Sequence, residues 1–144
     1  MKKFFVPLML LIIVPVLVSG QTTDPLVSKC AMNSGPNTTF LKDFRVQLPK
    51  GTTVPELRFK QIFPLSKNMT YKITLCNADN SKGQLIMILK DSQGNIQASS
   101  YDPKSGKVYP EVIFTCKQTG QYKINFDFRD FQEGLGVGIV SLVK

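Results

Sequence analysis

Apolar and polar residues alternate through much of the chain after its first forty residues. The clearest alternation spans residues 122–128, where Tyr122, Ile124, Phe126 and Phe128 are interleaved with Lys123, Asn125 and Asp127. Alternate side chains of a β-strand point to opposite faces, so this pattern predicts a strand with one buried face. Similar patterns predict strands near residues 40–48, 57–63, 69–76, 85–89, 96–101, 112–116 and 139–143.

Turn-forming residues separate these segments, as in Pro49-Lys50-Gly51 and in residues 91–95. No window repeats apolar residues with the period of a helix. Seven to eight short strands, with a turn signal about every ten residues, favour an all-β fold. We predict an antiparallel β-sandwich of the jelly-roll or Greek-key type, with a small closed barrel as the alternative.

A different pattern opens the chain. Lys2 and Lys3 precede an apolar run over residues 4–18, and Val18-Ser19-Gly20 places small residues before Gln21. This is the layout of a secretory signal peptide, here residues 1–20. The alternative is a retained anchor, but about 15 apolar residues are short of the roughly 20 that span a bilayer. We expect a secreted or periplasmic bacterial protein with no stable membrane span after cleavage.

The remaining chain has the length of one domain. We expect an irregular N-terminal arm over residues 21–37, rich in turn formers, and one β-sandwich domain over residues 38–144. Cleavage would leave 16 basic against 10 acidic side chains, a net charge of +6. Lys and Arg are dispersed without a basic block, and this argues against a nucleic-acid partner.

Three cysteines follow the signal segment, namely Cys30, Cys76 and Cys116. An exported chain can form disulfides, and three cysteines allow at most one internal bridge. We favour pairing Cys76 with Cys116, because each ends a predicted strand. Alternation opposes this pairing, since it places Cys116 on an apolar face and Cys76 on a polar face. A bulge at Cys76 would relieve the conflict; the alternative is that the cysteines are buried and free.

The composition gives little support to catalysis. The chain has no histidine, which removes the commonest general base and the commonest metal ligand. We therefore expect a protein that is not an enzyme and that carries no cofactor. One tight acidic group, Asp127, Asp130 and Glu133, raises the hypothesis of a weak calcium site. The alternative is a solvated strand end, because Asp127 belongs to the outward face of its strand.

Most aromatic residues fall in the inward register and are expected in the core. Tyr101, Tyr109 and Phe131 instead fall in loops or at loop edges. We therefore regard these three as the aromatic residues best placed for surface contact with a partner.

Three stretches carry a resemblance to known modules. They are Leu65-Ser-Lys-Asn-Met-Thr-Tyr71-Lys-Ile73, Leu85-Ile-Met-Ile-Leu-Lys-Asp91-Ser-Gln-Gly94 and Phe114-Thr-Cys-Lys-Gln-Thr-Gly120-Gln-Tyr122-Lys-Ile124. Over roughly residues 60–130 the chain resembles the GOLD domain of secretory cargo receptors and the bacterial pre-peptidase C-terminal domain. Both families share an Asp-x-x-Gly hairpin and a later Thr-Gly-x-Tyr. The resemblance implies binding or folding assistance rather than catalysis, and it assigns no functional residue.

These observations predict an exported, non-catalytic β-sandwich that acts as a binding or accessory module. Its partner would be another protein or a component of the cell envelope. The alternative is a structural subunit of an envelope assembly, joined by strand addition through residues 21–37.

Overall fold

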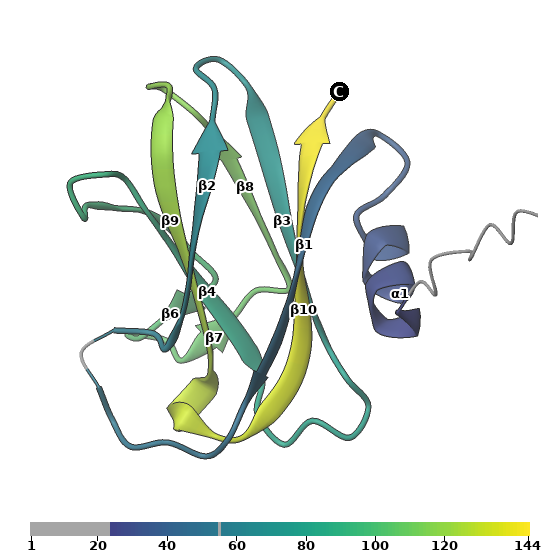
Figure 1. Ribbon diagram of the computed structural model, residues 1–144, viewed down its shortest axis with the longest axis vertical. Helices are drawn as coiled ribbons and strands as arrows, with labels where there is room; N and C mark the ends of the chain where they lie inside the picture. Colours follow the sequence, from purple (N-terminus) through teal and green to yellow (C-terminus); the bar gives the residue numbers. More distant parts are fainter. Residues whose placement is uncertain (1–23, 55) are drawn as a thin grey trace, which may run out of the picture.

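Two antiparallel sheets of four strands pack face to face in the computed structural model (Figure 1). Sheet A has the order β1 (Thr38–Leu48), β10 (Gly134–Val143), β3 (Thr70–Asn77) and β8 (Glu111–Thr115). Sheet B has the order β2 (Phe59–Leu65), β9 (Gly120–Phe128), β4 (Leu85–Lys90) and β5 (Ile96–Ser99). The predicted β-sandwich is therefore confirmed.

Three smaller elements complete the described chain. They are helix α1 (Pro25–Asn33), a short hairpin of β6 (Tyr101–Asp102) with β7 (Lys107–Val108), and a 3-10 turn η1 (Arg129–Phe131). The structure describes residues 24–54 and 56–144, so the predicted signal peptide lies outside the described residues. Within those ranges no helix combines the length and apolar character needed to cross a membrane.

The predicted inward residues of β9 fill the space between the sheets. Tyr122 is 5% exposed, and Ile124 and Phe126 are fully buried. They pack with inward side chains of β3 and β4 in one apolar cluster. Full burial of a side chain of this size contributes about 1.5–3 kcal/mol, so this alternation is a main source of the fold's stability.

Strand β1 contains a β-bulge near its start. The pairing of β1 with β10 shifts register between Phe40 and Lys42. The extra residue interrupts the alternation, so Phe40 does not share the buried face of Phe44. Phe40 is 49% exposed whereas Phe44 is 6% exposed, so the bulge places Phe40 outside the core.

The glycines of β10 allow the second sheet to approach closely. A Cβ atom at Gly138 would lie 2.5 Å from the ring of Phe126, and one at Gly134 would lie 2.5 Å from the ring of Phe128. Neither position tolerates a side chain without movement of an aromatic ring. The sequence suggests either a close approach or a bulge here, and the structure shows the close approach.

The predicted irregular arm contains a helix. Asp24 begins it as the N-cap, accepting a hydrogen bond from the backbone N–H of Leu26 at 2.9 Å, and Pro25 occupies the first turn. Helix α1 packs on the outer face of sheet A, where Cys30 joins a second buried cluster with Val137 and Ile139. The description of residues 21–37 as irregular is therefore wrong for residues 25–33.

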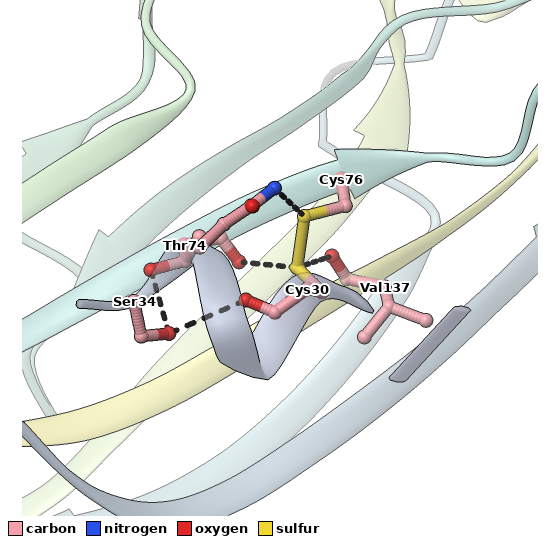
Figure 2. Close-up of a disulfide and its surroundings, with 6 residues drawn as sticks. Cys30, Ser34, Thr74, Cys76 and Val137 are labelled. Carbon is pink, nitrogen blue, oxygen red and sulfur yellow. Dashed lines mark hydrogen bonds between the residues drawn. A yellow bond between two sulfur atoms is a disulfide. The ribbon is translucent and has the colours of Figure 1, made fainter. Parts of the chain in front are cut away.

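The disulfide joins Cys30 to Cys76, not Cys76 to Cys116 (Figure 2). Their Cα atoms are 5.7 Å apart, and the bond ties α1 to β3. Cys116 is free and buried in the core between the sheets. The predicted pairing fails because Cys76 points outward toward the helix while Cys116 points inward, as the alternation indicates.

Polar contacts hold the end of α1 against the same strand (Figure 2). Ser34 Oγ lies 3.1 Å from Thr74 Oγ1 and 3.5 Å from the carbonyl oxygen of Cys30. Lys72 Nζ donates to the carbonyl oxygen of Ser34 at 3.0 Å. The helix is therefore held on the outer face of sheet A by a covalent bond and by hydrogen bonds.

Candidate functional site

The outer faces of the two sheets differ in what covers them. Helix α1 lies on the outer face of sheet A, whereas no helix of the described residues lies on sheet B (Figure 1). The uncovered face carries exposed lysine and isoleucine side chains. Its residues come from three adjacent strands, β2, β9 and β4, and their relative positions follow from the strand register.

One row of this face places two lysines opposite each other. Lys123 of β9 pairs in register with Lys90 of β4, and on its other side with Ile62 of β2. Like charges directly opposite each other across antiparallel strands are destabilising. An anion close to Lys90 and Lys123 would relieve this repulsion.

The adjacent row is centred on an asparagine. Asn125 of β9 lies opposite Lys60 of β2 and opposite Ile88 of β4. Although Asn125 belongs to the outward register, it is only 2% exposed, and its Oδ1 atom has no hydrogen-bond partner among the described residues. A buried polar atom without a partner costs about 1–3 kcal/mol, so Asn125 is a weak point of this row.

A single carboxylate lies between the lysines. Lys60 Nζ donates to Glu56 Oε2 at 2.5 Å, and Lys90 Nζ lies 3.7 Å from Glu56 Oε1. The hydrogen bond from Lys60, with the charges of Lys60 and Lys90, lowers the pKa of Glu56 below its ordinary value. The lysines therefore already favour a negative charge at this position.

These residues line a hollow of about 340 Å³. Its lining consists of Glu56, Lys60, Gln61, Ile62, Lys90, Gly94, Lys123 and Asn125. We call this surface the lysine face. It combines three ammonium groups with one carboxylate, an unpartnered amide oxygen and an isoleucine, Ile62, that is 64% exposed. Such a surface suits an anionic ligand that also has an apolar part.

A second hollow, of about 540 Å³, lies at the end of sheet A. Its two charged residues neutralise each other, because Lys82 Nζ lies 2.7 Å from Glu133 Oε1. The hydrogen bond from Lys82 lowers the pKa of Glu133. This hollow has no excess charge to recognise an ionic ligand, and we regard the lysine face as the better site.

The structure does not gather the predicted calcium ligands into a site. Asp127 is fully buried and pairs with Arg58, Asp130 lies 3.9 Å from Arg129, and Glu133 pairs with Lys82. No group of three potential ligands able to hold a metal occurs in residues 24–54 and 56–144. The hypothesis of calcium at Asp127, Asp130 and Glu133 therefore finds no support in the geometry. The alternative of a solvated strand end is wrong for Asp127, because Arg58 covers it.

The three aromatic residues proposed for surface contact lie around the β6–β7 hairpin and η1. Tyr109 is 44% exposed, with Lys107 Nζ 5.4 Å from its ring centroid. The guanidinium group of Arg129 stacks over Tyr101, and that of Arg58 over Phe131. Each ring thus has a cation beside it within the chain, and a contact role for these residues stays a prediction.

The free cysteine has the surroundings of a core residue. Cys116 is 1% exposed, and its sulfur lies 3.2 Å from the carbonyl oxygen of Gln118 and 3.5 Å from the hydroxyl of Tyr122. No basic side chain is among these partners, although a neighbouring cation is what usually activates a thiol.

Sequence reasoning did not single out the lysine face. The alternation predicts an outward position for Lys123, but its proximity to Lys60 and Lys90 depends on β9 lying between β2 and β4. That order joins segments far apart in the sequence. The one available signal was the polar outward row of β9, in which Asn125 lies between Lys123 and Asp127.

Comparisons with known proteins add no family to this description. No family model matches the chain, and a search of curated proteins finds no significant match. The resemblance to GOLD and pre-peptidase C-terminal domains stays a prediction from three sequence stretches.

Proposed function

We propose that this protein is an exported, non-catalytic binding module that recognises an acidic segment of a partner protein through the lysine face. The observation that carries the proposal is that Lys60 and Lys90 both contact one carboxylate position, with Lys123 opposite Lys90 in the sheet. Export is supported by the signal-like N-terminal sequence and by the disulfide between Cys30 and Cys76, since disulfides persist in oxidising compartments.

The choice of an acidic ligand rests on charge. The lysine face has a net charge of +2, from Lys60, Lys90 and Lys123 against Glu56. A peptide with acidic side chains supplies the complementary charge. Complementary charge of this kind contributes mainly to partner choice and to the association rate.

Exposed apolar area on the same surface favours a protein partner. Ile62 on β2 is 64% exposed and Ile96 on β5 is 62% exposed. Ile96 pairs in register with Lys90, so both isoleucines flank the lysine rows. Apolar side chains of a partner would be buried there at about 25 cal/mol per Å².

The alternative role, strand addition through residues 21–37, is disfavoured by the structure of this segment. Residues 25–33 are helical, and Cys30 is bonded to Cys76, so this part of the arm does not present an extended strand.

Binding of a fluorescently labelled glutamate-rich peptide, followed by anisotropy, tests the proposal. A glutamine-rich peptide of the same length serves as the ligand control. We expect Lys90→Gln with Lys123→Gln to weaken binding of the glutamate peptide by about tenfold, which corresponds to about 1.4 kcal/mol. The double variant Lys104→Gln with Lys107→Gln makes the same change of charge in the β6–β7 hairpin, and we expect less than about a twofold change.

Three results would overturn the proposal. They are equal weakening by both double variants, equal affinity for the two peptides, and binding to vesicles of anionic phospholipid without binding to the glutamate peptide. The last result would assign the lysine face to a membrane surface instead. Raising the ionic strength should weaken the specific complex, because exposed charges are screened within about 10 Å at 0.1 M salt.

A further inference from the structure

The lysine face already contains one carboxylate, and that carboxylate belongs to the chain itself. Glu56 precedes β2, and its side chain is 51% exposed. Two lysines from different strands bind it: Lys60 at 2.5 Å and Lys90 at 3.7 Å. The chain thus shows directly that a glutamate side chain fits between these two ammonium groups.

From this geometry we infer that Glu56 occupies the position of the partner's acidic side chain, and that the partner binds by displacing it. The inference rests on the proposed function. It names the ligand group, a carboxylate of a glutamate or aspartate, and makes Glu56 an internal competitor for Lys60 and Lys90.

Displacement of Glu56 requires little free energy. Its contact with Lys60 joins two exposed side chains, and surface pairs of this kind contribute little to stability. The Glu56 carboxylate is already in contact with solvent, so a change of side-chain rotamer is enough to vacate the position. Strand β2 keeps its own anchor, because Arg58 is bonded to Asp127 independently of Glu56.

The positive charge of the lysines, by contrast, is only partly neutralised within the chain. The Lys90 side chain is only 17% exposed and lies opposite Lys123 in the sheet. Among the described residues, no carboxylate lies within 4 Å of Lys123. One carboxylate therefore contacts two of the three ammonium groups, and Lys123 has no such contact among the described residues. A partner segment with more than one acidic side chain would satisfy the face better than Glu56 does alone.

The inference predicts that removing a negative charge from the chain improves binding at one position only. We expect Glu56→Gln to bind the glutamate-rich peptide about three- to tenfold more tightly than the natural chain. Glu133→Gln is the matched control, since it makes the same charge change at a similarly exposed carboxylate that pairs with Lys82. We expect Glu133→Gln to change the affinity by less than about twofold. Urea unfolding of both variants verifies that each is folded.

The outcomes separate this inference from the proposed function. An affinity of Glu56→Gln equal to or below that of the natural chain would overturn the inference, and so would an equal gain in Glu133→Gln. If the lysine variants weaken binding while Glu56→Gln gives no gain, the proposed function stands and the competitor role fails. If neither the natural chain nor Glu56→Gln binds the peptide, both fail.

Discussion

The guanidinium group of Arg58 forms a bidentate ion pair with the buried carboxylate of Asp127. Arg58 Nη2 donates to Asp127 Oδ1 at 2.9 Å, and Arg58 Nε donates to Oδ2 at 3.0 Å. The backbone N–H of Arg58 also donates to Oδ2 at 2.9 Å, and that of Phe128 donates to Oδ1 at 2.7 Å. The hydrogen bond with Asp127 raises the pKa of Arg58. Arg58 immediately precedes β2 and Asp127 belongs to β9, so the pair ties the start of β2 to its neighbouring strand.

Replacing the carboxylate should destabilise the fold strongly. Asp127→Asn removes the negative charge and directs an amide group toward the donors of Arg58 and Phe128. Breaking a buried pair by removing one partner costs about 3–5 kcal/mol. We expect a loss of this order in the free energy of unfolding, measured with urea. Asp79→Asn is the control, because the Asp79 side chain is 97% exposed and its loss should cost less than about 0.5 kcal/mol. Similar losses in both variants would contradict the buried pairing.

The disulfide should be identifiable by peptide mapping without reduction. We expect the peptides containing Cys30 and Cys76 to be linked, and Cys116 to react with a thiol reagent only after unfolding, because it is 1% exposed. Reduction should lower the free energy of unfolding by about 2–4 kcal/mol. Hydrogen exchange in residues 25–33 should increase at the same time. A link between Cys76 and Cys116 would refute this assignment.

A small side chain at Gly138 should disturb the packing between the sheets. In Gly138→Ala the new Cβ atom meets the Phe126 ring at 2.5 Å, and overpacking of this kind costs about 1–3 kcal/mol. Gly120→Ala is the matched control, since nothing lies within 4 Å of its Cβ position. Thermal unfolding of the two variants distinguishes them. Equal melting temperatures would show that the ring moves aside without cost.

Tyr122 should ionise at an unusually high pH. Its hydrogen bond with Cys116, together with burial, raises the pKa of Tyr122 to about 12. An unperturbed tyrosine has a pKa of about 10, so the folded state holds this proton more tightly than the unfolded state does. The stability contributed by Tyr122 is therefore fully present below about pH 10 and is lost as the pH rises toward 12.

Phenolate absorbance provides the measurement for Tyr122. We expect a titration step near pH 12 in the natural chain that is missing in Tyr122→Phe. Cys116→Ala should move this step to lower pH, because it removes the largest contribution to the shift. A natural chain without a step near pH 12 would contradict the hydrogen-bonded burial of Tyr122.

The strands were predictable because each depends on local alternation. The period of two in residues 122–128 places Tyr122, Ile124 and Phe126 in the core without reference to any other strand. The bulge beside Phe40 could not be predicted from β1 alone. It is defined by the pairing of β1 with β10, which the local sequence does not specify. Helix α1 has a local signal in Asp24-Pro25, the N-cap and first-turn pair, but the helix is too short for a clear apolar period.

The site was less predictable because it depends on contacts across the sequence. The outward register of Asp127 was correct, yet its burial comes from Arg58, which lies 69 residues earlier in the chain. The lysine face likewise requires β9 between β2 and β4, an order that no local pattern specifies. Alternation already assigned Cys76 and Cys116 to opposite faces, and giving that observation more weight would have excluded their pairing.

The covalent attachment of α1 makes the two broad sides of this molecule unequal. One side is closed by a helix that cannot dissociate while Cys30 and Cys76 stay oxidised, and the other presents bare sheet to its surroundings. A label or surface linker attached at Met32, which is 81% exposed on that helix, would orient the lysine face toward solution. In a protein immobilised in this way, the outer face of sheet B would be accessible to ligands in solution.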